Sequence, residues 1–321
     1  MPENPPQLVH LERFPLVRLR AAWTVRERIE LKGFHGNTVR GLIGSALRDA
    51  VCADRRRDCS ECSERRECPW LYLFRTSDVH DLLARGGRAT PPSPLVVEPA
   101  SGGSVFNPGD TFRIETVLLG DGLEHLEALL RALRRAGSVG LGRRRAGMRL
   151  HHVDYVRGSG RSCAYGPGRK FCRPPFDPTL GALAPPIDRA SEERSSIVIR
   201  LCTPLRIKRR GELLSKIDFT DLVEAAHWRI ALLGKFYAPD LSIPSAEDVQ
   251  DLASRCTTST VELDTREEWT DRGRERCPAG GITGHLVVEG DWAPLLPLLR
   301  LAEQVHAGKG ATRGLGKIVL G

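Results

Sequence analysis

Two kinds of apolar spacing alternate along the chain in a regular order. In the first half, period-two or continuous apolar runs predict strands over 15–25, 94–98, 111–119 and 148–156, and helical spacing predicts helices over 38–51 and 122–135. Read in chain order, these elements predict a β-α-β-β-α-β unit.

The same order returns in the second half of the chain. Strands are predicted over 195–202, 258–263, 282–289 and 316–320, and helices over 218–236 and 291–304. Between the halves, residues 157–193 are rich in Gly, Pro, Ser and Arg and show no sustained period, which is typical of a linker or a long irregular excursion. The pattern therefore predicts an N-terminal domain over 1–156 and a C-terminal domain over 194–321.

Residue identities at one constant offset support a duplication. The matching pairs are Leu129 with Leu298, Leu130 with Leu299, Arg131 with Arg300, Arg144 with Arg313, and Gly147 with Gly316. All of them lie in a leucine-rich helix or in the glycine-rich loop after it. A β-α-β-β-α-β unit is the ferredoxin-like arrangement, so the predicted fold class is α+β with two tandem ferredoxin-like domains.

Composition narrows the class of partner. Apolar residues make up 40% of the chain, enough for a real core, and the net charge of +8 with a pI near 9.2 favours a polyanion such as RNA, DNA or an anionic membrane. The N-terminus lacks a secretory signal pattern, and no apolar run approaches the roughly 20 residues that span a bilayer. We expect a soluble, cytoplasmic protein without a membrane partner.

A glycine-rich basic loop is predicted over 306–317, HAGKGATRGLGK. Glycines allow the backbone to approach phosphate oxygens closely, and the cations neutralise their charge. The spacing differs from a P-loop, and the segment precedes a strand rather than a helix. The candidate RNA-binding residues are His306, Gly308, Lys309, Gly310, Arg313, Gly314, Gly316 and Lys317.

A second loop of this kind closes the first half at 137–147, GSVGLGRRRAG. Its successive cations Arg143, Arg144 and Arg145 either follow backbone phosphates or form an ordinary solvated turn. Because only 6% of the residues are aromatic, no stacking platform is visible, and phosphate contacts should dominate binding.

A cysteine-rich insertion over 52–68 follows the first predicted helix. Cys52, Cys59, Cys62 and Cys68 have the spacing C-x6-C-x2-C-x5-C, which suits a tetrahedral thiolate site better than a disulfide framework in a reducing compartment. Zinc is the default ion and would be structural, because four thiolates leave no open position. An iron-sulfur cluster is a less favoured alternative, and four unliganded cysteines are the other.

Three stretches of the chain carry a resemblance to a known family. They are FHGNTVRGLIGSALRDAVC with the cysteines and LYLF at 71–74, GLGRRRAG at 140–147, and VHAGKGATRGLGKIVL at 305–320. The chain resembles the CRISPR-associated precursor-RNA processing endoribonucleases of the RAMP superfamily, in the subset with a cysteine insertion. The C-terminal glycine-rich ending is the most specific part of the resemblance.

The resemblance implies binding of CRISPR repeat RNA and one metal-independent cut in each repeat, which generates guide crRNA. Such a cut uses attack by the 2'-hydroxyl, leaves a 2',3'-cyclic phosphate, and needs a general base and nearby cations. His35 is the leading candidate base, because it lies just before the first helix, where many relatives carry a catalytic histidine. Lys32 and Arg40 are close enough in sequence to assist.

Two other functions remain open at this point. The first is a non-catalytic crRNA-binding subunit of a CRISPR effector complex, whose other subunits would be partners. The second is a zinc-stabilised interaction protein whose basic surface meets another polyanion. The segment 269–276, WTDRGRER, differs from the more polar, serine-containing pattern associated with relatives.

Overall fold

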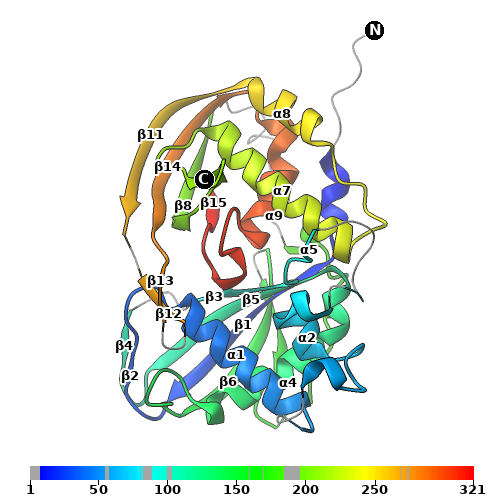
Figure 1. Cartoon of the computed structure of the whole chain (residues 1–321), viewed down its shortest axis with the longest axis vertical. Coiled ribbons are helices and arrows are strands. Elements are labelled where there is room, and N and C mark those ends of the chain that lie inside the picture. Colours follow the sequence, from blue (N-terminus) through cyan, green and yellow to red (C-terminus); the bar gives the residue numbers. More distant parts are fainter. Residues whose placement is uncertain are drawn as a thin grey trace.

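The computed structural model describes residues 8–54, 58–79, 81, 89–99, 103–158, 160–168, 170–183, 196–267, 269–272 and 275–321. Figure 1 shows two lobes, each with a sheet and its helices, and the C-terminal glycine-rich loop lies between them. The strands of each lobe come from one half of the sequence.

The first lobe is built on a five-stranded antiparallel sheet. In spatial order its strands are β3 (Leu95–Glu98), β5 (Thr111–Leu119), β1 (Leu16–Val25), β6 (Met148–Arg157) and β7 (Gly160–Tyr165). The first four strands have the ferredoxin-like order, with the first and third predicted strands adjacent at the centre. Helices α1 (Gly36–Val51) and α4 (Leu126–Val139) pack together beside this sheet.

The second lobe repeats that topology. Its four-stranded sheet has the order β11 (Cys256–Arg266), β14 (Gly281–Gly290), β8 (Ser196–Leu205) and β15 (Ile318–Leu320), with helices α7 (Phe219–Tyr237) and α9 (Leu296–Val305). Both sheets therefore confirm the predicted pair of β-α-β-β-α-β units. Helix α8 (Ala246–Ser254) was not predicted, although Ser245 and Asp248 form a capping box at its start.

Short elements complete the described part of the chain. They are α2 (Pro69–Phe74), α5 (Leu180–Leu183), and the strand pairs β2 (Ile29–Glu30) with β4 (Val105–Phe106), β9 (Lys208–Arg209) with β10 (Glu212–Leu213), and β12 (Trp269–Arg272) with β13 (Glu275–Pro278). Short 3-10 helices include Leu8–Arg13, Cys59–Glu61, Thr76–Val79, Gly120–His125, Ala293–Leu295 and Ala311–Arg313.

The predicted linker differs from the structure over its described part. Strand β7 adds to the edge of the first sheet, and Phe171 and Phe176 pack against the core of the first lobe. Local Gly and Pro content predicted an irregular segment here, but burial of these rings ties it to the lobe. Residues 184–195, which include the end of the predicted linker, lie outside the described residues.

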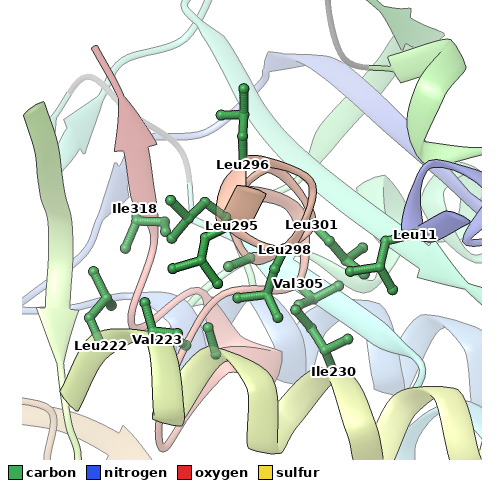
Figure 2. Close-up of a cluster of buried hydrophobic side chains, with 14 of the residues drawn as sticks. Leu11, Leu222, Val223, Ile230, Leu295, Leu296, Leu298, Leu301, Val305 and Ile318 are labelled. Carbon is green, nitrogen blue, oxygen red and sulfur yellow. The ribbon is translucent and has the colours of Figure 1, made fainter. Parts of the chain in front are cut away.

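The core of the second lobe surrounds α9. Figure 2 shows Leu295 and Leu298 of this segment facing Val223 of α7, with Leu11 from the N-terminal segment alongside α9. The same cluster includes Leu16 and Val117 on the first sheet, so the second lobe packs against that sheet through a continuous apolar core. This packing fixes the C-terminal loop against the first lobe.

Candidate functional site

The N-terminus of α1 meets the C-terminal glycine-rich loop. His35 is the residue before the helix, and a Cβ on Gly36 would lie 1.9 Å from the carbonyl oxygen of Arg313. The Arg313 guanidinium donates a hydrogen bond of 2.9 Å to Asn37 Oδ1. Only glycine permits this approach at position 36, so the sequence FHGN allows the loop to rest directly on the start of the helix.

The β12–β13 hairpin also packs at this place. Strand β12 contacts α1, and a Cβ on Gly33 would lie 2.4 Å from the carbonyl oxygen of Trp269. Phe34, Ala279 and Leu315 form a small buried cluster that joins the three segments. We refer to residues 33–37, Trp269 and residues 309–315 as the junction. Trp269 itself is 43% exposed there.

His35 lies at the junction in a half-buried position. Burial lowers the pKa of its imidazole below the ordinary value of 6.5, although a hydrogen bond with the backbone of Gly33 opposes this shift. Its Nδ1 atom is inaccessible to solvent and has no hydrogen-bond partner within the described residues. The ring is therefore mostly neutral at pH 7, which is the state that accepts a proton. Lys32, the predicted assistant, has an exposed side chain.

Arg40 has a different environment from the one expected of a catalytic cation. Its guanidinium donates hydrogen bonds to the carbonyl oxygens of Leu73, Leu95 and Thr312 and to Ser93 Oγ. It also lies 4.5 Å from the centre of the Phe74 ring, and burial lowers its pKa to about 10. Because its guanidinium is occupied by these internal partners, Arg40 is not placed to assist catalysis as predicted. Arg40 instead fastens the glycine-rich loop, through Thr312, to β3 and α2.

His306 does not have the position expected of an RNA contact. Its side chain is 0% exposed, its Nδ1 lies 3.1 Å from the carbonyl oxygen of Leu315, and its Nε2 lies 3.1 Å from Glu98 Oε1. Gly314 and Gly316 are buried as well. In this structure these three residues are not accessible for direct RNA contact, because the loop folds inward between the lobes. Gly308 and Gly310 are half-buried.

Other predicted cations remain available at the surface. Lys309 is exposed, whereas Arg313 and Lys317 are half-buried and bonded to Asn37 and Glu98, respectively. The loop therefore offers one freely exposed predicted cation and two that also hold the structure together.

Arg143, Arg144 and Arg145 are exposed on a tight turn that is closed by reciprocal backbone hydrogen bonds of 3.0 Å between Leu141 and Ala146. Just after this turn, the Gly147 N–H donates to Glu27 Oε2 at 3.0 Å, which places the arginines beside the β1–β2 end of the first sheet. Lys32 lies two residues after β2, so the two basic groups lie in one region of the first lobe.

A buried ionic network lies behind the glycine-rich loop. The carboxylate of Glu98, at the end of β3, contacts Arg18 at 2.6 Å, His306 at 3.1 Å and the Lys317 ammonium. Burial alone would raise the Glu98 pKa, but the His306 hydrogen bond and the Arg18 and Lys317 charges hold it well below its usual range. Sequence reasoning missed Glu98, although a carboxylate ending the apolar run LVVE was a usable signal.

The four predicted metal ligands lie together. Cys52, Cys59, Cys62 and Cys68 all line one pocket, along with Arg48 and Trp70. The structure thus collects these cysteines from the end of α1, a short 3-10 helix and the start of α2. The junction, by contrast, lies at the other end of α1.

These features define a duplicated ferredoxin-like protein with a basic surface and a histidine beside a glycine-rich loop. Residues 199–318 match the family model of the CRISPR-associated endoribonuclease Cas6, and residues 14–173 match a family model described as an N-terminal domain. The second lobe is therefore similar to the Cas6 family of CRISPR-associated endoribonucleases. No curated protein matches it in a sequence search.

Several solved structures share this fold. Cas6 from Thermus thermophilus has a TM-score of 0.52 and 16% identity, covering 96% of this chain and 98% of that one. A Cas6 product complex has a TM-score of 0.53 and 18% identity, covering 95% and 99%. A chain of a partial Cas6-RT-Cas1–Cas2 complex has a TM-score of 0.54 and 17% identity, covering 97% of this chain and 47% of that one. Within the described residues, no helix is long and apolar enough to cross a membrane.

Proposed function

We propose that this protein binds CRISPR repeat RNA and cuts it without a catalytic metal ion to produce guide crRNA. The observation that carries the proposal is the position of His35 at the N-terminus of α1, next to Gly36 and Asn37, which contact the glycine-rich loop of the region that matches the Cas6 model. Exposed Lys32 and Lys309 belong to the segments that meet there. The site thus combines a neutral imidazole with cations suited to phosphate.

In the proposed reaction, His35 accepts the proton of the ribose 2'-hydroxyl as this oxygen attacks the adjacent phosphorus. The new O2'–P bond forms while the P–O5' bond breaks, and the leaving 5'-oxygen takes up a proton. The products are a 2',3'-cyclic phosphate and a 5'-hydroxyl. The His35 side chain makes no capping hydrogen bond to α1, and the positive end of the helix dipole favours the phosphate charge that develops during the reaction.

Incubation of the protein with end-labelled repeat RNA in EDTA tests this function directly. We expect one cut per repeat and a 2',3'-cyclic phosphate end, which phosphatase leaves intact until acid opens the ring. A repeat with a single 2'-deoxyribose at the cut position should bind and remain whole. If the wild-type protein binds the normal repeat without cutting it, both in EDTA and with divalent ions, the non-catalytic crRNA-binding function is favoured instead.

We propose that the protein partners are other CRISPR proteins. One chain of similar fold belongs to a complex described as Cas6-RT-Cas1–Cas2, which supports association of this fold with CRISPR components. Co-purification of the protein with its neighbouring CRISPR proteins, with and without repeat RNA, tests this association. Recovery of the chain free of them under both conditions would contradict it.

The exposed arginine turn gives a prediction about salt dependence. Changing Arg143, Arg144 and Arg145 together to alanine should weaken repeat RNA binding and reduce the slope of log affinity against log salt concentration. The expected reduction is up to about 2 for three lost contacts to single-stranded phosphates. Fluorescence anisotropy over a salt series measures this slope.

Lys309→Ala should reduce the slope of log affinity against log salt concentration by about 0.7, as expected for the loss of one contact to a single-stranded phosphate. Arg255→Ala provides a matched control, because this exposed arginine pairs with Asp251 on α8, away from the arginine turn. Unchanged slopes in both the triple variant and Lys309→Ala would remove these groups from the RNA interface.

A further inference from the structure

We propose that Cys52, Cys59, Cys62 and Cys68 bind one structural zinc ion that joins the end of α1 to the start of α2. The four side chains line a single pocket although they come from separate short segments. Cys52 ends α1, Cys68 precedes α2, and Cys59 and Cys62 flank the bend formed by the 3-10 helix Cys59–Glu61. All four are free of disulfide bonds.

The chemistry of the pocket suits a zinc tetrathiolate. Four thiolates satisfy the tetrahedral preference of zinc and leave no position for water, so the ion would be structural. Such a site carries a net negative charge, and the Arg48 guanidinium lines the same pocket, 4.7 Å from the centre of the Trp70 ring. Arg48 lies one helical turn before Cys52, whose N–H donates to its carbonyl oxygen at 3.0 Å. A cation is therefore fixed beside the sulfurs by the helix itself.

Binding requires the sulfur atoms to turn toward one another. Within the described residues, no three Cys, His, Asp or Glu side chains already have the spacing of a coordination shell. All four cysteines are half-buried, and rotation about χ1 moves a sulfur between staggered positions without moving the backbone. The Asp58 carboxylate accepts the N–H of Ser60 at 2.9 Å and preserves the bend that separates Cys59 from Cys62.

The zinc ion would stabilise a helix that supports the junction. Helix α2 has only six residues, which is too short to be stable without tertiary contacts. Its Leu73 carbonyl accepts a hydrogen bond from Arg40, and its Phe74 ring lies under the same guanidinium. Tyr72 contacts the Tyr237 ring of α7 at 5.8 Å between centroids. Loss of the ion should therefore loosen α2 and the contact between the lobes.

Metal analysis of the full chain, purified without an affinity tag that binds metals, tests the inference. We expect about one zinc ion per chain, as for a closed four-cysteine site. A mercurial reagent that titrates thiols should release this zinc in proportion, as measured with a colorimetric chelator. Folded wild-type protein without zinc would overturn the proposal, and so would iron with acid-labile sulfide.

Cysteine variants test whether zinc binding depends on the four pocket cysteines and not on the other cysteines of the chain. The double variant Cys59→Ser with Cys62→Ser should lose zinc and melt at a lower temperature than the wild type. Matched variants Cys172→Ser and Cys202→Ser, at exposed positions outside the pocket, should keep the full zinc content. Retention of zinc in the double variant would also overturn the proposal. If the double variant does not fold, mercurial titration of the wild type still decides the outcome, independently of RNA cleavage.

Discussion

Replacing His35 by alanine is expected to lower the rate of repeat RNA cleavage by about 10²–10⁴-fold, the usual contribution of a general base. RNA affinity should change little, because the exposed cations around the junction remain in place. The imidazole is held where the start of α1 meets the glycine-rich loop, and no other histidine lies among the residues that define the junction. Single-turnover cleavage at saturating protein concentration, with anisotropy for binding, measures the two effects separately.

His285→Ala is a suitable control, because this half-exposed histidine lies on β14 and pairs only with Glu262 among the ion pairs described. It should cleave at the wild-type rate. Equal cleavage by His35→Ala and the wild type would exclude His35 as the base, while leaving endoribonuclease activity itself in place. The comparison therefore distinguishes a wrong residue from a wrong function.

The pH dependence of the cleavage rate should follow the titration of the His35 imidazole. Since burial lowers the imidazole pKa below its ordinary value of 6.5, the neutral base is already present in mildly acidic solution. The single-turnover rate of the wild type should therefore rise with pH and level off at a lower pH than an imidazole with the ordinary pKa would give. The rise belonging to His35 should be missing from the residual activity of His35→Ala. A rate that falls as pH rises through this range would contradict the role as a base.

Replacing Glu98 by alanine is expected to destabilise the protein by about 3–5 kcal/mol, the usual cost of removing one partner from a buried ion pair. The Glu98 side chain is only 7% exposed, and its loss would leave Arg18 and Lys317 without this counter-charge and His306 without its carboxylate partner. Urea denaturation at pH 7 measures the change in unfolding free energy.

A matched exposed pair serves as the control for Glu98. Glu30→Ala breaks an ion pair with Arg28 in which both side chains are more than half exposed, so we expect a loss of about 1 kcal/mol or less. Equal stability of Glu98→Ala and Glu30→Ala would show that the buried network contributes no more than a surface pair. Glu98→Gln should lie between them, because it keeps the shape and some hydrogen bonding but loses the charge.

Acid should weaken the same network. The folded-state pKa of Glu98 lies well below its ordinary value of 4.5, so its stabilisation is complete above that value and decreases as pH falls toward the folded-state pKa. Burial also lowers the pKa of His306, despite the opposing effect of Glu98, and its contribution decreases as pH falls through and below 6.5. Both groups thus favour the folded state at neutral pH.

Local spacing in the sequence was sufficient to predict the duplicated fold. Period-two runs such as TFRIETVLL and leucines at helical intervals specify which backbone faces are buried, and these patterns gave both β-α-β-β-α-β units. The β12–β13 hairpin and α8 were missed, because short elements carry too few periods to be recognised. The cysteine spacing likewise identified a cluster that the fold brings to one pocket.

Amino-acid type and local spacing thus determined the elements, their order and the candidate chemistry of this protein. Only the tertiary structure decided which candidates face solvent. Arg40 and His306 make internal hydrogen bonds to Thr312 and Glu98, respectively. These partners lie 272 and 208 residues away in the chain, so the local sequence did not reveal them. The start of α1 meets Arg313 because Gly36 has no side chain in the way of the Arg313 carbonyl oxygen. Burial and hydrogen bonding across such separations depend on how the lobes pack, which no local pattern records.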